Sequence, residues 1–250
     1  MKSYKEVVKE RYDGYEKDIH AYENIYSLIN PIGFNADKKI RSVFYNAFNL
    51  FRNAGMDITK SSILDIGCGK GATTRFFSEL TNSPQNIYGL DLSVHRIECA
   101  VKMNSIISYR IGDIVHLPAF PVMFDIITAI DVFMHLKEKK EIIQALTNIK
   151  EKLNDNGYFI WYDAYSKNHF KTTQNQDHSG FHPKQMVDLA EEAGFEKVTQ
   201  INLFKKIFWK YHSFYLINKF PVPFVNFLAC ILPGNPGNMM VIFRKGIKKQ

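Results

Sequence analysis

Short apolar runs alternate along the chain with longer segments in which apolar residues recur at helical spacing. Short runs of this kind indicate buried strands, and the longer periodic segments indicate helices that pack on them. We predict strands at residues 62–66, 86–91, 106–111, 124–131, 158–163, 195–203 and 238–244. This alternation is typical of an α/β fold whose sheet is mostly parallel.

Most of the predicted helices have recognisable end signals. We expect helices at residues 35–51, 93–104, 138–153 and 183–193, a helix that starts directly after the glycines of residues 67–71, and one or two more within residues 3–24, where they would cover a cofactor. Asn30–Gly33 is predicted to interrupt the helical pattern before the helix at 35–51. Asn154–Gly157 is predicted to end the helix that starts at Glu138. Ser93 and Pro183 are typical residues of helix N-termini.

The stretch Ser62–Phe77 carries the clearest chemical signal. An apolar run with one acid, Asp65, leads into alternating glycines and then into a helix start. Glycines permit positive φ and let a ligand approach the backbone closely, and the helix start offers unpaired N–H groups. Gly67, Gly69 and Ala72 also satisfy the dinucleotide fingerprint, so the loop alone fits two classes of cofactor.

Asp65 distinguishes between these two classes. It stands two residues before the first glycine, where we expect its carboxylate to face the ligand. A dinucleotide would place its anionic pyrophosphate there, and repulsion at ~4 Å would cost roughly a few kcal/mol. A ligand with an ammonium and a sulfonium group is attracted instead. We therefore favour S-adenosylmethionine as the cofactor, with S-adenosylhomocysteine as its product.

Two further acids follow predicted strands. Asp91 ends the second strand beside the glycine loop, where its carboxylate is placed to accept hydrogen bonds from both hydroxyls of a ribose. Asp113 follows the third strand within Gly112–Ile114. We expect Asp113 to bind the amino group of the adenine and Ile114 to pack on the ring.

In this order and spacing, the motifs resemble those of class I S-adenosylmethionine-dependent methyltransferases. The motifs that carry the resemblance are Leu64–Gly71, Asp91, Gly112–Ile114, Phe124-Asp125 and His135-Leu136. The match covers roughly Ile40 to Arg244. It implies a Rossmann-like seven-stranded sheet in the order 3-2-1-4-5-7-6, with the last strand antiparallel.

The resemblance also implies which residues bind the cofactor. Asp65 and Gly67 would hold the methionine moiety, and Ile130 and Met134 would line the methyl-donor end. The full set that it implies is Asp65, Gly67, Cys68, Gly69, Gly71, Asp91, Leu92, Asp113, Ile114, Ile130 and Met134. Asp131–Met134 stands where amino-group methylases of nucleic acids carry a Pro-Pro-aromatic tetrapeptide, which argues against a nucleobase as acceptor.

Methyl transfer to a hydroxyl group requires removal of a proton, which a positioned His, Asp or Glu assists. His135 follows the fourth strand, and His178 and His182 lie in the long polar loop after the fifth. We name these three histidines as candidate catalytic bases. The alternatives are a turn cap for His135 and solvated loop positions for the other two. We expect no metal ion, and a site made of Asp163, Asp177 and His178 is the less favoured alternative.

Composition and charge limit the partners. The net charge is +7, but the lysines are scattered and no nucleic-acid-binding motif is present, so we expect a small-molecule or glycan substrate, compatible with an anionic one, and no nucleic acid. The three cysteines have neither paired nor metal-ligand spacing, which indicates a reducing compartment. The charged N-terminus does not have the pattern of a signal peptide. We therefore expect a cytoplasmic protein.

The length of 250 residues suits one methyltransferase domain. Within it we expect an N-terminal helical cap (1–56), a Rossmann-like core (62–203 and 238–245) and an aromatic-rich helical insertion (204–237) before the last strand. We interpret the insertion as a lid or a dimer surface. A helix pair that touches a membrane is the alternative.

The sequence thus predicts an enzyme that transfers a methyl group from S-adenosylmethionine to a small-molecule or carbohydrate-linked acceptor, in the first place to an oxygen. The arrangement also resembles methyltransferases of bacterial surface-polysaccharide pathways, such as capsular polysaccharide, which implies O-methylation of a sugar hydroxyl or a phosphate-type decoration. Two alternatives stay open. One is a membrane-associated methyltransferase of a lipid or quinone intermediate, and the other is a non-catalytic regulator that binds the cofactor.

Overall fold

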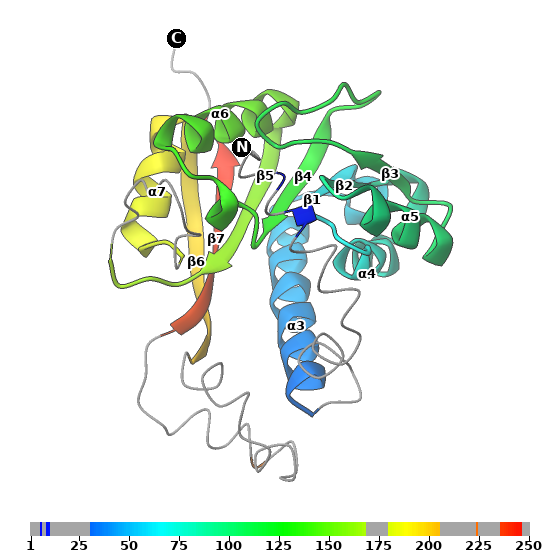
Figure 1. The fold of residues 1–250 in the computed structure, drawn as a ribbon, viewed down its shortest axis with the longest axis horizontal. Helices are drawn as coiled ribbons and strands as arrows, with labels where there is room; N and C mark the ends of the chain where they lie inside the picture. The colour runs from blue at the N-terminus through cyan, green and yellow to red at the C-terminus, as the bar shows by residue number, and fades with distance from the viewer. Residues whose placement is uncertain are drawn as a thin grey trace. The chain divides into compact units, whose positions relative to one another are not determined.

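The computed structural model describes residues 6, 9–10, 31–168, 180–205, 224 and 236–246 (Figure 1). The chain divides into two compact units, one made of Phe51–Ile201 with Met239–Gln250 and the other of Met1–Leu50 with Asn202–Asn238. The first unit corresponds to the expected Rossmann-like core. Most of the expected N-terminal helices and of the aromatic insertion lies outside the described residues, and the single-domain organisation stays a prediction.

A seven-stranded mixed sheet forms the centre of the fold. Its strands are β1 (Ile63–Ile66), β2 (Ile87–Asp91), β3 (Ser108–Ile111), β4 (Phe124–Ile130), β5 (Leu153–Ala164), β6 (Phe195–Lys205) and β7 (Pro236–Lys245). The order is β3-β2-β1-β4-β5-β7-β6, and the pairs between β3 and β5 are parallel. In Figure 1 the arrow of β7 runs opposite to those of β5 and β6. The predicted fold class and strand order are confirmed.

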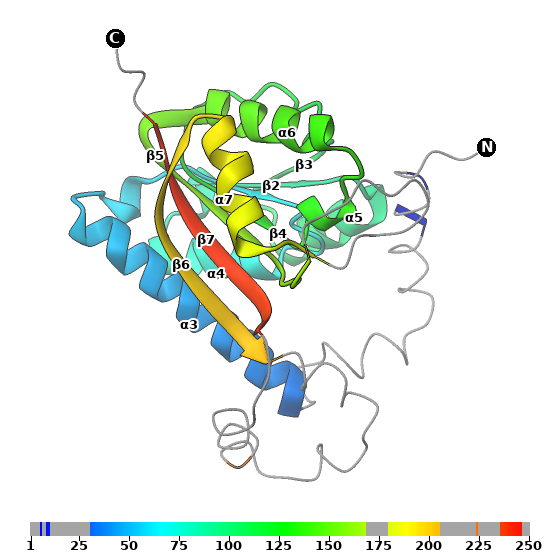
Figure 2. The same cartoon turned by 90° about the vertical axis from the view of Figure 1, so that its left-hand side faces the viewer.

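The helices connect the strands in the predicted alternation. They are α3 (Pro31–Asn53), α4 (Ala72–Thr81), α5 (Val94–Met103), α6 (Lys139–Lys152) and α7 (Pro183–Glu192), with short 3₁₀ turns η1 (Ile58–Lys60), η2 (Pro84–Asn86) and η3 (Phe133–His135). Ser93 caps α5 by accepting a hydrogen bond from the N–H of Arg96, as its sequence position suggests. Figures 1 and 2 show α6 and α7 side by side. None of the described helices is both long and apolar enough to cross a membrane.

Two element boundaries differ from the prediction by four residues or more. Helix α3 begins at Pro31 rather than at Asn35, because proline is tolerated in the first turn, where its missing N–H has no helical partner. Strand β5 begins at Leu153 and runs through the predicted stop at Asn154–Gly157. Leu153 pairs with Phe124 of β4, and the Nδ2 of Asn154 donates to Oδ1 of Asp125 at 2.7 Å, so this polar stretch has partners in the sheet.

The buried core lies along β4 and β5 and continues under η3. The ring of Trp161 in β5 lies 4.3 Å from that of Phe133 in η3 and 5.0 Å from that of Phe181, measured between centroids. All three side chains are completely buried. Aromatic packing therefore fixes the turn that follows β4, which is one edge of the candidate site.

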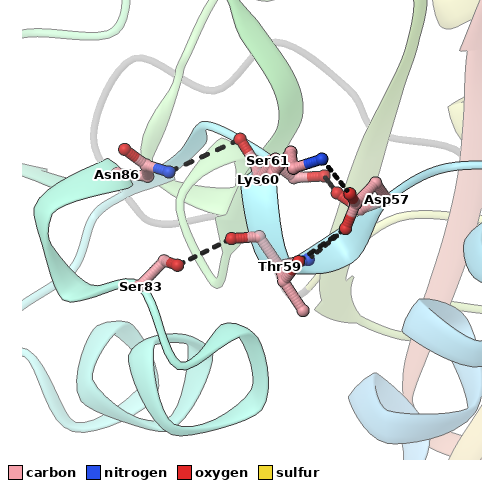
Figure 3. A network of polar contacts seen from close by, with 6 residues as sticks. All are labelled: Asp57, Thr59, Lys60, Ser61, Ser83 and Asn86. Atoms are coloured by element: carbon pink, nitrogen blue, oxygen red, sulfur yellow. Dashed lines mark hydrogen bonds and ion pairs between the residues drawn. The ribbon is translucent and has the colours of Figure 1, made fainter.

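A polar network joins the turns that precede β1 and β2 (Figure 3). Asp57 caps η1 by accepting from the N–H and hydroxyl of Thr59. The hydroxyl of Ser83 donates to the carbonyl of Thr59 at 2.6 Å, and the side chain of Asn86 donates to the carbonyl of Lys60 at 3.4 Å. These bonds hold together the amino ends of the two strands, whose carboxyl ends lie at the same edge of the sheet because the strands are parallel.

Candidate functional site

The glycine loop connects β1 to α4 at the carboxyl edge of the sheet. Gly67, Gly69 and Gly71 all have positive φ, at 71°, 55° and 76°. A Cβ atom at position 67 would clash with the side chain of Val132, which follows β4, and one at position 71 would clash with the hydroxyl of Tyr109 in β3. The loop is thus a tight backbone turn that only glycine can form without strain.

Asp91 holds this loop from the end of β2. Its Oδ2 accepts a hydrogen bond from the N–H of Gly69 at 2.8 Å, and its Oδ1 accepts from the N–H of Ser93 at 2.9 Å. The N–H groups of Gly67 and Cys68 donate to the carbonyl of Leu90, at 2.7 and 3.0 Å. A carboxylate has about four acceptor positions. Asp91 therefore fixes the loop and keeps lone pairs for a ligand.

Asp65 lies beneath the loop. Its Oδ2 accepts from the hydroxyl of Thr74, in the first turn of α4, at 2.6 Å, and its Oδ1 accepts from the hydroxyl of Thr128 in β4 at 2.8 Å. Burial raises the pKa of its carboxyl group to about 6, against the effect of the two hydroxyl donors. This position differs from the expected one, because the carboxylate faces the interior between β4 and α4 instead of the surface.

The expected adenine-binding residues occupy the turn after β3. Oδ1 of Asp113 accepts from the N–H of Val115 at 2.9 Å, and Oδ2 lies 3.6 Å from Nδ1 of His116. Ile114 is buried in the hydrophobic core, whereas Leu92 after β2 is exposed. Cys68 in the glycine loop is buried, which raises the pKa of its thiol. Cys68 is thus a packing residue and not a reactive thiolate.

The ends of β4 and β5 bring two acids together. Asp131 follows Ile130 of β4, has a left-handed φ of 52°, and donates its N–H to the carbonyl of Tyr162 at 2.9 Å. The next residue along β5 is Asp163, which is completely buried. The surrounding protein removes solvation from the carboxyl group of Asp131 and raises its pKa to about 7, although the residue as a whole is exposed. Burial, and to a smaller extent the charge of Asp131, raise the pKa of Asp163 well above its ordinary value.

Asp131 has no predicted role of its own, and Asp163 is predicted only as part of the less favoured metal site. The signal that could have identified the pair is their placement at the ends of two adjacent predicted parallel strands. Within the described residues, no group of three or more His, Cys, Asp or Glu side chains could hold a metal ion.

The three histidines named from the sequence have different surroundings. His135 is partly buried in η3, next to Met134, at the same edge as Asp131. His182 is the N-cap of α7, because its Nδ1 accepts from the N–H of Lys184 at 3.2 Å. His178 lies outside the described residues, as does Asp177. Of the two described histidines, only His135 lies beside the end of β4.

Comparison with solved structures identifies the fold. The chain superimposes on magnesium protoporphyrin IX methyltransferase from Synechocystis, solved with bound S-adenosylmethionine, with a TM-score of 0.64 and 12% identity over 98% of this chain and 99% of that one. It also superimposes on phosphoethanolamine N-methyltransferase 2 from Haemonchus contortus, with a TM-score of 0.66 and 17% identity over 99% of this chain and 61% of that one. Both structures contain S-adenosylmethionine, the cofactor expected from the sequence.

Sequence comparison gives shorter matches to proteins of known activity. A malonyl-[acyl-carrier protein] O-methyltransferase from Hamiltonella defensa is 30% identical over 112 residues, which are 45% of this chain and 36% of that protein. A tRNA U34 carboxymethyltransferase from Campylobacter jejuni is 28% identical over 115 residues, or 44% and 38% of the two chains. The matched part thus spans little more than a third of these relatives.

The family assignment comes from a longer match. Residues 59–209 match the family described as "Methyltransferase domain", which covers β1 to β6 together with the glycine loop, Asp91 and the Asp131–Asp163 pair. The predicted resemblance to S-adenosylmethionine-dependent class I methyltransferases is confirmed by this match and by the shared fold. The chain belongs to the methyltransferase domain family.

Proposed function

We propose that the protein uses S-adenosylmethionine to methylate an oxygen of a small-molecule or carbohydrate-linked acceptor. The observation that carries the proposal is the glycine loop held by Asp91 at the carboxyl edge of β1 and β2. Ligands of open α/β sheets bind at this edge. When bound, S-adenosylmethionine supplies a methyl group on a sulfonium, an electrophile that needs no metal.

The residues at this edge fit that cofactor. Gly67 and Gly71 give the loop its tight turn, because Val132 and Tyr109 fill the space that a side chain would need. Asp91 has lone pairs left for two ribose hydroxyls, and exposed Leu92 offers an apolar surface beside it. Asp113 is proposed for the adenine amino group, and Ile130 and Met134 for the methyl-donor end. Asp65 would not contact the cofactor directly but would hold the glycine loop in place through its bonds to Thr74 and Thr128.

An oxygen acceptor is favoured by the groups at the ends of β4 and β5. A hydroxyl must lose its proton as the new O–C bond forms, and a group that holds protons near neutral pH assists most. Asp131, with a pKa of about 7, and His135 both lie at this edge. Sugar hydroxyls and phosphate-type decorations of surface polysaccharides are the acceptors that we propose to test first.

Binding measurements test the cofactor. Calorimetry is expected to show binding of S-adenosylmethionine and S-adenosylhomocysteine and none of NAD. Asp91→Asn removes one charged acceptor and is expected to weaken S-adenosylmethionine binding by about tenfold or more. Asp125→Asn changes an aspartate at the amino end of β4, far from the carboxyl edge at which Asp91 lies, and serves as the matched control. A folded protein that binds NAD in place of these ligands would overturn the proposal.

Transfer of a labelled methyl group tests the acceptor. The protein is incubated with methyl-labelled S-adenosylmethionine and, in separate samples, with sugar nucleotides, phosphorylated glycans, bulk tRNA, malonyl-acyl carrier protein or vesicles containing quinones. Label is expected in the sugar or glycan samples, at an ether or ester oxygen. Label confined to tRNA, to the carrier protein or to the vesicles would contradict the oxygen-of-a-sugar proposal while keeping the cofactor assignment.

A further inference from the structure

Asp163 is the most completely enclosed acid at the carboxyl edge. Its side chain has no solvent exposure, and its Oδ2 accepts hydrogen bonds from the indole N–H of Trp161 at 3.1 Å and from the N–H of Met134 at 3.2 Å. Its Oδ1 accepts a third bond, from the N–H of Ala164 at 3.2 Å. Two of these three N–H donors thus converge on one oxygen, Oδ2.

This arrangement fixes the turn after β4. Met134 is the central residue of η3, and the ring of Phe133, the residue before it, packs on Trp161. The same two residues of β5, Trp161 and Asp163, therefore hold the turn through a ring contact and a hydrogen bond. His135 and Met134 depend on this support for their position at the edge.

The bonds also indicate where a proton is held. A carboxylate oxygen has two lone pairs, and those of Oδ2 are used by Met134 and Trp161. A neutral Asp163 therefore carries its proton on Oδ1. Full burial favours this neutral form, because an ionised carboxylate would lose its hydration. Of the described ionisable side chains, Asp131 is the one whose charge acts on Asp163. The groups of β5 and η3 that contact the Asp163 carboxyl group are the N–H donors of Trp161, Ala164 and Met134.

Asp131 links Asp163 to the glycine loop. The residues on either side of it face Gly67: a Cβ on Gly67 would meet the side chain of Val132 and lie 3.8 Å from the carbonyl oxygen of Ile130. On the other side, Asp131 is bonded to Tyr162, the neighbour of Asp163. Asp131 thus stands between the loop and Asp163, exposed and in a left-handed conformation that costs a non-glycine residue about 1 kcal/mol.

We propose that Asp163 is a positioning residue of the methyl-transfer site: as a neutral acid, it holds the turn that carries Met134 and His135 and leaves the single negative charge of the pair on Asp131. This inference rests on the proposed methyltransferase function. A single negative charge beside the glycine loop attracts a sulfonium and accepts a proton from a hydroxyl. Two negative charges on these neighbouring acids would repel each other.

Asparagine is a close replacement for a neutral Asp163. Its carbonyl oxygen can accept from Met134 and Trp161, and its NH₂ group takes the place of the protonated Oδ1, with loss of the bond that Oδ1 accepts from the N–H of Ala164. Asp163→Asn is therefore expected to fold and to keep slow hydrogen exchange at the amide of Met134. Asp163→Ala removes both bonds and is expected to speed that exchange at least tenfold. Asp125→Asn, on the same strand pair but at the opposite edge, is the matched control and should leave Met134 unchanged.

Carboxyl NMR of the protein labelled at aspartate tests where the charge lies. Asp131 is expected to titrate at nearly the same pH in the wild type and in Asp163→Asn, because its partner is neutral in both. Asp131→Asn is expected to move the titration of Asp163 to lower pH, since a like charge is removed. A fall of a unit or more in the titration of Asp131 in Asp163→Asn would overturn the proposal, because it would show that Asp163 is normally charged.

Binding of S-adenosylmethionine relative to S-adenosylhomocysteine gives an independent readout, because only the first has a sulfonium charge. The preference for S-adenosylmethionine is expected to rise about fivefold as pH passes through the titration of Asp131, in the wild type and in Asp163→Asn. It should stay flat in Asp131→Asn. A preference that changes with pH equally in Asp131→Asn overturns the role of the charge. If neither ligand binds the folded protein, the proposed function fails, and hydrogen exchange and NMR still decide the role of Asp163.

Discussion

Asp65 combines a buried carboxyl group with two hydroxyl donors, and its surroundings decide how stability depends on pH. Its pKa rises from the ordinary value of 3.8 to about 6 on folding, mainly because burial removes hydration. The folded protein therefore binds more protons than the unfolded chain between these pH values, and the contribution of Asp65 to stability falls as pH rises through this window. The size of the loss is about 3 kcal/mol.

Asp65→Asn is expected to remove this loss. The free energy of unfolding of the variant, relative to that of the wild type, should rise by about 3 kcal/mol between pH 4 and pH 7. Urea denaturation at several pH values measures this difference. The amide can still bond Thr74 and Thr128, so the comparison isolates the charge. A constant difference across this range would show that Asp65 is ionised throughout.

Gly67 allows a second experiment on one residue. Gly67→Ala is expected to destabilise the protein by more than about 1 kcal/mol, because of the positive φ and the clash with Val132, and to weaken binding of S-adenosylmethionine. Gly55→Ala is the matched control, since Gly55 has a φ of 95° and no atom within 4 Å of the added Cβ. Calorimetry should show normal binding in the control. Adding Val132→Ala should recover part of the loss in Gly67→Ala.

Among the elements, α7 gives a structural role to His182, which we named from the sequence as a candidate catalytic base. His182 caps the helix with Nδ1, and Pro183 occupies the first turn. A capping side chain contributes roughly 1 kcal/mol, and asparagine is among the best caps. His182→Ala is expected to lower the free energy of unfolding by about this amount, and His182→Asn to restore it. Methyl transfer that is lost in both variants, with stability restored in the second, would return His182 to the list of candidate bases.

At the scale of the elements, the order of strands and helices could be predicted, because period and end signals are local properties of the sequence. The start of β5 could not. Asn154–Gly157 has the composition of a turn, and its place in the strand depends on Asp125, which is distant in the sequence. The direction of the Asp65 side chain depends in the same way on Thr128 of another strand. Contacts of this kind follow from the assembled sheet.

For the whole molecule, ligand binding should stabilise the assembled core. S-adenosylmethionine at 100 times its dissociation constant is expected to raise the free energy of unfolding by about 2.7 kcal/mol, and NAD to leave it unchanged. Thermal unfolding with increasing ligand measures the effect. A stabilisation by NAD that equals that by S-adenosylmethionine would contradict the proposed cofactor preference.

The cofactor class could be predicted from the sequence, although the predicted direction of the Asp65 side chain was wrong. The spacing of the glycine loop, Asp91 and Asp113 led to the family, whereas the expected direction of Asp65 did not hold. The acceptor could not be predicted in the same way. Acceptor sites are formed by side chains from several elements, and how those side chains lie relative to one another follows only from the assembled sheet.

The contact between Tyr109 and the glycine loop has a consequence for how related sequences vary. The ring of Tyr109 fills the space beside Gly89, where an added Cβ would lie 2.5 Å from it, and its hydroxyl fills the space beside Gly71. Three positions on three different segments therefore form one steric unit. Among homologues, an alanine at position 89 should occur together with a smaller residue at position 109, whereas position 71 should stay glycine because of its positive φ. The glycine loop, to which we assign the cofactor, is thus constrained by the choice of residue on the outermost strand of the sheet.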